Sequence, residues 1–593
     1  MGERGAIVEK SILGQEWRVS SLDEALAARI AQQNNVADVV ARVMLVRGIG
    51  PAEAADFITP QIKRLLPDPY TMKDMDKAAR RVANAVANGE DIGIFGDYDV
   101  DGATASALLH RFFKLAGVPA DKIFVHIPDR KDDGYGLSEA GLALLKEKGA
   151  SLVIAVDCGI TAFDAARSAT AMGLDLVIAD HHESEVAIPD AVAVVDAKRV
   201  DDTSGLNNLA AVGVAFLLCV ATNRLLRNEG YFQDSPPPDL FPLLDLVAFG
   251  TVCDVVPLVG VNRAFVSAGL KVLAKRTNPG LKALSDLASA SASPTAFDLG
   301  YILGPRINAG GRVGDSSLGE KLLSTDNRLE AEHFAHKLDN FNNERKAIEN
   351  AVIMAAEGKM ENTDFEQDGF IFISGADWHT GVIGIIAGRM KEKYRVPAFV
   401  ATELPTGIAN GSARSVVGVD IGAAIIRAKE EGILIEGGGH FMAAGFTLKT
   451  ANIPRFREFL KNFISSGEAG KTPILTIDAV LDPSGITGEL MKSIEVLEPF
   501  GAGNEEPRFA LLGARLSSSD AIGGGNIRAY FTSDNGRGIS AILYRGVDTE
   551  LGEALLSGVG KQFKVAGKAR VNEYMGRKNL QFVIDDMAPY TPL

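Results

Sequence analysis

The sequence predicts an α/β protein with several domains, and three observations support this prediction. Continuous apolar runs alternate with helical runs between residues 78 and 200, which is typical of a parallel sheet whose strands are buried on both faces. A long charged helical run over 317–358 separates this region from a second alternating region. From about residue 472 the chain consists of short β-rich segments between Gly and Asn turns, which favours a small closed barrel such as an OB-fold.

Each element follows from its local pattern. Residues 20–65 have helical periodicity punctuated by prolines, so we expect an N-terminal helical segment. The first alternating region predicts strands at 91–96, 122–128, 151–157, 174–180 and 191–196, and helices at 102–116, 138–148, 161–172, 209–228 and 240–252. The second predicts strand 370–374, helix 381–394, strand 397–401 and helix 420–430. The resulting domain boundaries are 1–75, 76–315, 316–358, 359–468 and 469–593.

Length and composition are those of a large globular protein. The chain has 593 residues, more than one hydrophobic core usually supports, with 46% apolar and 23% charged residues. Its longest apolar stretch, 209–222, is too short to span a bilayer, and the first residues lack the pattern of a signal peptide. The three cysteines form no CxxC and lie in apolar runs, which indicates reduced, buried thiols. We therefore expect a cytoplasmic protein that makes no membrane contact.

The charge distribution leaves nucleic-acid binding open. A net charge of −15 argues against non-specific binding, which depends on neutralising phosphates with Lys and Arg. However, residues 561–578 hold six basic side chains against one acidic side chain, and 389–395 form another basic cluster. A basic groove on an acidic body is therefore allowed.

The most informative motif is Asp97-Tyr-Asp99-Val-Asp101-Gly102, between a predicted strand and a predicted helix. Three carboxylates at alternate positions repel one another unless a cation neutralises them. Carboxylate oxygens suit hard divalent cations. For the motif alone, a solvated acidic turn is an equally good explanation.

Other strands of the same sheet end in side chains that bind metals. The third strand ends in Asp157 and the fourth in Asp180-His181-His182, and ligands of parallel sheets bind at these carboxyl ends. Asp254 follows an apolar helix, where an isolated Asp is usually a cap or turn residue. Carboxylates and imidazoles without thiolates favour Mn²⁺ or Mg²⁺ over structural zinc. Five or six ligands exceed the need of one ion, so we expect two divalent metal ions and a phosphate ester or anhydride as substrate.

An ordered set of motifs resembles the DHH phosphoesterase superfamily, named for the Asp180-His181-His182 triplet, and within it the RecJ family of bacterial single-strand-specific 5′→3′ DNA exonucleases. The matching segments span about residue 20 to the C-terminus: 96–102, 128–137, 156–159, 179–183, 250–257, 304–312, 378–384, 411–415, 437–440 and 499–504. The resemblance implies a parallel-sheet DHH catalytic domain, a long connecting helix, a second α/β DHH-associated domain and a C-terminal OB-like β-barrel.

The resemblance also implies roles for individual residues. The metal ligands would be Asp97, Asp99, Asp101, Asp157, His181 and Asp254, with Asp157 bridging and with Asp99 and Asp101 serving different metals. The catalytic set adds His182, which would face the scissile phosphate, and Asp180, which would orient His181. One departure is Asp196-Ala197, where an Asn-Pro is expected; it affects a turn and leaves the ligands alone.

The second lobe and the barrel provide candidates for nucleic-acid binding. Glycines let a backbone approach phosphate closely and Arg offers a bidentate fork, although a plain turn is the alternative for Gly437-Gly-Gly. The candidates for the DNA backbone or the 5′-terminal phosphate are Arg130, Arg306, Asn308, Arg312, His379, Ser412, Arg414 and His440. In the barrel, Tyr574 is the candidate for base stacking, whereas Phe563 and Phe582 are expected in the core.

The expected function is hydrolysis of single-stranded DNA from its 5′ end, releasing 5′-mononucleotides in DNA repair and recombination. The resemblance implies a single-strand-binding protein and a helicase as partners, and we expect a monomer. Two alternatives stay open. One is another DHH activity, such as an oligoribonucleotide or cyclic-dinucleotide phosphodiesterase or a pyrophosphatase. The other is a catalytically inactive DNA-binding scaffold, against which the presence of every expected ligand argues.

Overall fold

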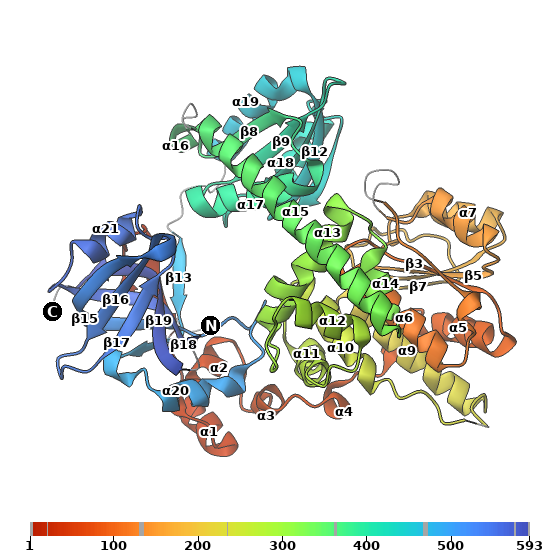
Figure 1. Cartoon of the computed structure of the whole chain (residues 1–593), viewed down its shortest axis with the longest axis horizontal. Helices are drawn as coiled ribbons and strands as arrows, with labels where there is room; N and C mark the ends of the chain where they lie inside the picture. The colour runs from red at the N-terminus through yellow and green to blue at the C-terminus, as the bar shows by residue number, and fades with distance from the viewer. Residues whose placement is uncertain are drawn as a thin grey trace.

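The computed structural model describes residues 4–20, 22–129, 136–233, 235–360, 365–466, 473–574 and 577–590. Figure 1 shows three lobes, with the parallel-sheet domain on the right, a second α/β domain at the top and a β-barrel on the left. This arrangement confirms the predicted fold class. The domain boundaries given above stay predictions.

The catalytic-domain sheet has five parallel strands in the order β4-β3-β5-β6-β7. The strands are β3 (Ile92–Phe95), β4 (Ile123–His126), β5 (Leu152–Val156), β6 (Asp175–Ala179) and β7 (Ala193–Val195). Side chains of β5 alternate between two hydrophobic cores, with Ile154 on one face and Val153 and Ala155 on the other. Burial on both faces explains why these strands are continuous apolar runs in the sequence.

Helices cover both faces of this sheet. They are α5 (Met75–Asn88), α6 (Val100–Leu115), α7 (Glu139–Glu147), α8 (Phe163–Ala171) and α9 (Ala211–Asn228). Three further helices, α10 (Leu244–Cys253), α11 (Gly260–Leu273) and α12 (Pro279–Leu287), pack against helices rather than against the sheet. The π-helix η4 (Asp298–Leu303), α13 (Gly304–Val313) and α14 (Leu318–Ser324) complete the domain. Within the ranges that the structure describes, every helix is too short or too polar to cross a membrane.

The long connecting helix is α15 (Arg328–Met360), which runs from the catalytic domain to the upper lobe in Figure 1. The sequence predicts one helical run from 317, but the chain breaks between α14 and α15. At the break, the side chain of Asn327 accepts the N–H of Leu329 at 2.9 Å and so caps the new helix. Farther along, the buried Glu349 pairs with Arg345 at 2.8 Å and with Arg389 of the upper lobe.

The upper lobe holds a mixed sheet in the order β11-β12-β10-β9-β8. Its elements are α16 (Phe365–Asp368), β8 (Ile371–Ala376), α17 (Thr380–Tyr394), β9 (Ala398–Glu403), β10 (Ile408–Arg414), α18 (Ile421–Glu430), β11 (Glu436–His440), β12 (Ala443–Lys449) and α19 (Ile453–Ser466). The segment Gly437-Gly438-Gly439 lies in the edge strand β11, paired with β12. It is therefore an edge strand rather than a plain turn.

The C-terminal lobe is a closed barrel, because β15 pairs with β18 in addition to its neighbours in the order β14-β15-β16-β17-β19-β18. The strands are β14 (Ala479–Leu481), β15 (Arg508–Ile522), β16 (Asn526–Thr532), β17 (Gly538–Leu543), β18 (Gln562–Tyr574) and β19 (Arg577–Pro589), with helices α20 (Gly488–Ile494) and α21 (Glu550–Leu556). Phe563 and Phe582 are buried in the barrel core, as predicted.

Much of the predicted basic run in the barrel makes contacts within the protein. Lys564 donates to the backbone carbonyl of Ile7 at 2.7 Å, and Arg570 binds the carboxylate of Glu506. The side chain of Tyr574, the predicted stacking residue, lies outside the described residues. Exposed side chains of β16 offer another surface, since Arg528 and Tyr530 alternate with the buried Ile527 and Phe531.

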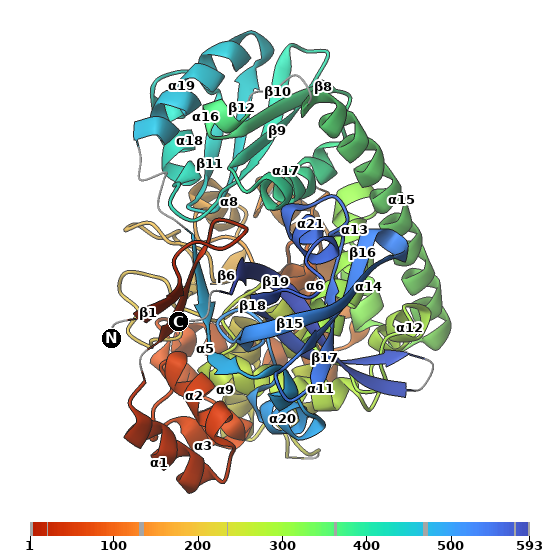
Figure 2. The ribbon, with the colours of Figure 1, turned by 90° about the vertical axis from the view of Figure 1, so that its left-hand side faces the viewer.

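The N-terminal segment begins with strands, which corrects the prediction of a purely helical segment. Strands β1 (Arg4–Val8) and β2 (Glu16–Ser20) form a hairpin, and β2 pairs in parallel with β13 (Ile474–Ile477). The helices α1 (Glu24–Asn34), α2 (Asp38–Val46), α3 (Ala54–Ile58) and α4 (Ile62–Leu65) follow. Figures 1 and 2 both place α1–α3 at the base of the barrel, so the start and the end of the chain share one core.

Trp17 anchors this hairpin to the barrel. It is fully buried, and its indole N–H donates to Oδ2 of Asp586 on β19 at 3.0 Å. Trp17 and Trp378 are the two tryptophans of the chain. A Trp378→Phe background therefore makes Trp17 the fluorescent reporter of the hairpin.

In that background, we expect Asp586→Ala to lower the urea concentration at which Trp17 becomes exposed. The change leaves a buried indole N–H without its acceptor, which costs roughly 1–3 kcal/mol. Tryptophan emission during urea unfolding measures the effect. Asp548→Ala, which removes an exposed carboxylate of the same lobe, is the control and should not move the transition. An unchanged midpoint for Asp586→Ala would contradict the docking role.

Candidate metal centre

The carboxyl ends of three neighbouring strands bring the predicted ligands together. Asp97, Asp99 and Asp101 follow β3, Asp157 follows β5, and Asp180-His181-His182 follow β6. The turn after β3 is tight, since a Cβ on Gly102 would lie 2.5 Å from the carbonyl oxygen of Asp97. Only glycine allows α6 to start that close to the strand.

The acidic and imidazole side chains form three overlapping groups whose ligand atoms lie within 4.8 Å of one another. One group contains Asp97, Asp99 and Asp157, and another contains Asp101, His181 and Asp254. The third, Asp157 with His181 and His182, joins the first two. Asp99 and Asp101 thus fall into separate groups, and Asp157 lies between them, in agreement with the arrangement that the resemblance implies.

His181 is at the centre of the second group. Its Nε2 lies 3.2 Å from Oδ1 of Asp157 and 3.8 Å from Oδ2 of Asp101, and its Nδ1 lies 3.5 Å from Oδ2 of Asp254. Among the described residues, Nδ1 of His181 and Oδ2 of Asp254 are buried atoms without a hydrogen-bond partner. Two lone-pair acceptors facing each other in a buried place are suited to a shared cation.

Helix N-termini hold two of the aspartates in place. Asp99 caps α6, accepting the backbone N–H groups of Asp101 at 2.9 Å and Gly102 at 3.1 Å. Asp101 accepts the N–H groups of Ala211 at 2.6 Å and Val212 at 2.9 Å, at the start of α9. Each carboxylate is thereby oriented by backbone donors and by the positive end of a helix.

Burial and mutual repulsion shift these carboxylates toward their neutral forms. Burial first, and the charge of Asp254 second, raise the pKa of Asp101 to about 7. Burial, followed by the charge of Asp99, raises the pKa of Asp254 to about 7. Burial and the neighbouring aspartates also raise the pKa of Asp157 well above its usual value. A divalent cation removes this penalty, because it supplies the missing positive charge.

The donor set fits Mn²⁺ or Mg²⁺. It consists of carboxylate oxygens and imidazole nitrogens, which suit these ions. Cys158 and Cys253 are nearby in the chain, but none of the metal groups found among the described residues includes a cysteine. The residues that could hold the two ions are therefore the two outer groups, which the third group links through Asp157 and His181.

Asp180 orients His182, which corrects the expectation that it orients His181. Nδ1 of His182 lies 2.7 Å from Oδ1 of Asp180, whereas His181 contacts this carboxylate through its backbone N–H at 2.7 Å. Burial opposes the charge on His182, but the hydrogen bond to Asp180 raises its pKa to about 9. His182 is thus a half-exposed imidazole that Asp180 orients at the edge of the metal groups, where it can donate to a phosphate oxygen.

Asp196-Ala197, which stands where the resemblance leads us to expect Asn-Pro, forms a turn, as the sequence suggests. Oδ1 of the buried Asp196 accepts the N–H of Lys198 at 2.7 Å, and burial raises the pKa of Asp196 to about 7. The residue stands after β7, beside the ligand-bearing strands, and none of the metal groups found among the described residues includes it.

Arg414, Ser412 and His440 lie together on the upper lobe. Arg414 and His440 both pair with Ala443 across the sheet, so their side chains share a face. Among the described residues, the Arg414 guanidinium bonds to Oγ of Ser412 at 3.1 Å and to the carbonyl of Ala413 at 2.8 Å rather than to a carboxylate. Burial lowers the pKa of Arg414, so an anion would compensate this charge.

The remaining nucleic-acid candidates have different surroundings. The Arg306 guanidinium binds Oδ1 of Asp339 on α15 at 2.9 Å, so its observed role is to join α13 to α15. Arg312 donates to the carbonyl of Gly381 at 2.9 Å and so links the lobes, beside His379, which caps α17. Asn308 is half-buried on α13. Arg130 lies outside the described residues.

A pocket beside the metal groups holds residues that the sequence interpretation missed. It has a volume of about 480 Å³ and is lined by Glu183, Ala197, Lys198, Asn207, Asn208, Val256 and Pro257. Nζ of Lys198 lies 3.3 Å from Glu183, the residue after the Asp-His-His triplet. The sequence signal that could have identified Lys198 is its position shortly after the fifth predicted strand.

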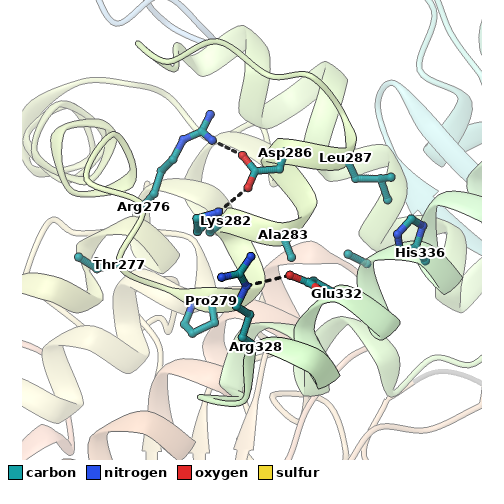
Figure 3. A pocket seen from close by; sticks show the side chains of 11 residues that line it. Arg276, Thr277, Pro279, Lys282, Ala283, Asp286, Leu287, Arg328, Glu332 and His336 are labelled. Carbon is teal, nitrogen blue, oxygen red and sulfur yellow. Dashed lines mark hydrogen bonds and ion pairs between the residues drawn. The ribbon is translucent and has the colours of Figure 1, made fainter.

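A second pocket, between α12 and α15, is not part of this centre. Figure 3 shows that its cationic side chains are engaged, with Arg276 and Lys282 on Asp286 and Arg328 on Glu332. These ion pairs leave little positive charge for an anionic ligand.

Three family models match the chain. The model described as the DHH family, N-terminal domain, matches residues 91–251, the DHHA1 domain matches 367–466, and the RecJ OB domain matches 477–586.

Several known proteins and solved structures are similar to this chain over most of its length. The single-stranded-DNA-specific exonuclease RecJ of Bacillus subtilis is 33% identical, over 96% of this chain and 70% of that protein. RecJ of Escherichia coli is 32% identical, over 92% of this chain and 95% of that protein. The crystal structure of RecJ with Mn²⁺ from Thermus thermophilus has a TM-score of 0.80 at 27% identity, covering 97% of this chain and 80% of that one.

We expect the metal centre to affect the thermal stability of the protein, both with and without divalent cations. Without divalent cations, Asp157→Asn should melt above the parent protein, because one buried, repelling charge is gone and Asn tolerates the left-handed backbone (φ 60) of this position. With Mn²⁺ at a hundred times its dissociation constant, the parent should gain about 2.7 kcal/mol for each bound ion and the variant clearly less.

Differential scanning calorimetry in EDTA and in MnCl₂ measures both effects. Asp190→Asn, an exposed carboxylate of the same domain, is the control and should behave as the parent. Equal Mn²⁺-induced shifts in parent and Asp157→Asn would remove Asp157 from the site.

Proposed function

The chain belongs to the RecJ family of single-stranded-DNA-specific exonucleases, and from this premise we propose that it hydrolyses single-stranded DNA from the 5′ end with two divalent cations. The observation that carries the proposal is the set of acidic and imidazole groups at the carboxyl edge of the parallel sheet, in which Asp157 and His181 link the two outer groups. A metal-dependent exonuclease of this kind acts in DNA repair and recombination.

The metal pair supplies positive charge for the reacting phosphate and a water of lowered pKa when it is bound. Asp97, Asp99 and Asp157 would hold one ion, and Asp101, His181 and Asp254 the other. Asp180 keeps His182 oriented and charged, so that this imidazolium donates to an oxygen of the scissile phosphate. The geometry of the three groups and the resemblance both support these roles.

The upper lobe would bind the 5′-terminal phosphate. Ser412, Arg414 and His440 offer a hydroxyl, a half-buried guanidinium and an imidazole on one face of the sheet. Gly384 makes room for them, since a Cβ there would lie 3.1 Å from Oγ of Ser412. Arg312 and His379 position α17 beside this face, and Arg306, whose Nε binds Asp339, stays a candidate for contact with the DNA backbone.

The barrel and the cellular setting complete the proposal. The basic and aromatic surface of an OB-like barrel suits the downstream strand, through Tyr574 or the exposed Arg528 and Tyr530. A single-strand-binding protein and a helicase would supply the substrate strand to a monomeric enzyme. The work of a chromosomal repair nuclease implies a cytoplasmic location.

A degradation time course tests the reaction. We expect 5′-labelled single strands to release labelled mononucleotide at once, whereas the 3′ label should stay in shortening strands and blunt duplexes should resist. Mn²⁺ and Mg²⁺ should each support the reaction and EDTA should stop it. Faster cleavage of a dinucleotide or a cyclic dinucleotide than of a long strand would indicate one of the alternative DHH activities.

We expect Asp157→Ala to abolish hydrolysis while leaving single-strand binding close to that of the parent, because the residue holds cations rather than DNA. Nuclease assays and fluorescence anisotropy in Ca²⁺ or EDTA measure the two properties separately. Robust hydrolysis by the purified variant would contradict the assignment of Asp157 to the metal site.

We expect Arg414→Ala to raise KM for 5′-phosphorylated strands by roughly 10–100-fold, since a hydrogen bond to a charged group contributes about 1.5–3 kcal/mol. Strands with a 5′-hydroxyl should be affected much less. Arg427→Ala on α18 removes an exposed arginine of the same lobe and is the matched control. Equal effects on both kinds of strand would place the phosphate elsewhere.

A further inference from the structure

The segment Pro499–Asn504 is a closed loop that connects the barrel to the catalytic domain. It lies between the 3₁₀ helix η7 (Glu495–Leu497) and β15. Gly501 and Asn504 bond to each other through their backbones at 2.9 and 3.1 Å. The fully buried side chain of Asn504 donates to the carbonyls of Leu497 and Pro499, both at 2.8 Å. These bonds give the loop one shape.

This closed loop contacts the segment that carries the ligand Asp254. The N–H of Leu258 donates to the carbonyl of Ala502 at 2.8 Å. A Cβ on Gly503 would lie 2.9 Å from Cβ of Pro257, and a Cβ on Gly501 would lie 2.6 Å from Cδ1 of Leu258. The glycines of the loop are therefore required by close contact with residues 257 and 258.

The segment after Asp254 needs such support. Asp254 ends α10, and Val255 has a φ of 60°, a left-handed conformation that a β-branched residue adopts only when its surroundings enforce it. The buried Asn262 holds the segment from the catalytic side, with its amide on the carbonyl of Pro257 at 3.1 Å. The loop from the barrel side holds the next residue, Leu258.

The loop is itself anchored by a buried arginine. The guanidinium of Arg263 donates to the carbonyls of Glu498 at 2.6 Å and Val496 at 3.3 Å, and to that of Phe57 at 2.7 Å while packing over the Phe57 ring. A buried charge satisfied by several carbonyls tolerates little displacement. The connection from the barrel to the Asp254 segment is thus stiff along its whole length.

We propose that the loop 499–504 is a positioning element of the metal centre, which fixes Asp254 and so sets the cation affinity of the Asp101–His181–Asp254 group. The inference rests on the proposed two-metal function. It makes the barrel linker part of the catalytic machinery, in addition to any role of the barrel in holding DNA. The other group is held by the ends of β3 and β5 rather than by the segment after Asp254, so its cation affinity should be independent of the loop.

The test is Mn²⁺ binding to the full chain, by calorimetric titration and by electron paramagnetic resonance of the unbound ion. Gly503→Ala introduces the contact with Pro257 and a strained φ of 67°. Asn504→Ala loosens the loop without entering the Asp254 segment. Gly536→Ala, with a φ of 79° and open space around its Cβ, is the matched control for backbone strain in the same lobe. Asp254→Asn gives the reference for loss of one site.

We expect two Mn²⁺ ions on the parent protein and on Gly536→Ala. Gly503→Ala and Asn504→Ala should weaken one site about 10-fold, the size of effect typical of groups that orient metal ligands, and should leave the other unchanged. The weakened site should be the one lost in Asp254→Asn. If Gly503→Ala does not fold, Asn504→Ala decides alone.

Two results would overturn the inference. Parent-like Mn²⁺ affinities at both sites in Asn504→Ala would show that the loop does not position Asp254. Equal weakening of both sites would show a general loss of structure. A parent protein that binds fewer than two Mn²⁺ ions would instead contradict the proposed function, and the inference with it.

Discussion

The repulsion among buried carboxylates at one edge of the parallel sheet is the constraint on which the rest of the structure depends. Asp101 and Asp157 are almost fully buried, and burial together with neighbouring charges raises the pKa of both. Such a cluster is unfavourable by itself, and a divalent cation makes it favourable. Metal binding and stability are therefore coupled at this site, and the surrounding elements serve to hold the ligands against their own repulsion.

Helix starts, close contacts and remote segments all contribute to that support. The N-termini of α6 and α9 supply backbone donors to Asp99 and Asp101. The C-terminus of α10 delivers Asp254, and the barrel linker holds the segment that follows. The proposed phosphate-binding face of the upper lobe is linked to the same domain through Arg312 and through α15. Each lobe thus contributes to one centre, although the ligands themselves belong to a single domain.

Local sequence was sufficient wherever a pattern had a local cause. Continuous apolar runs marked the five parallel strands, because the strands inside the sheet are buried on both faces, and polar residues after those runs marked the candidate ligand positions. Alternation in the C-terminal region marked the barrel, including the buried Phe563 and Phe582. Side-chain hydrogen-bond partners could not be predicted from the local sequence. The carboxylate of Asp180 bonds to the ring of His182 rather than to that of His181, and Arg306 bonds to Asp339 on a helix that no local pattern places beside it.

The sequence by itself determined the fold class, the order of the domains and the residue types of the metal centre, because these depend on periodicity and on the chemistry of each side chain. Only the tertiary structure decided the pairing of the N-terminal hairpin with β13, the edge-strand role of Gly437–Gly439 and the contact of Asp180 with the ring of His182. These features depend on contacts between residues far apart in the chain. Such contacts are selected by the shape and burial of both partners, so neither partner's own sequence reveals them.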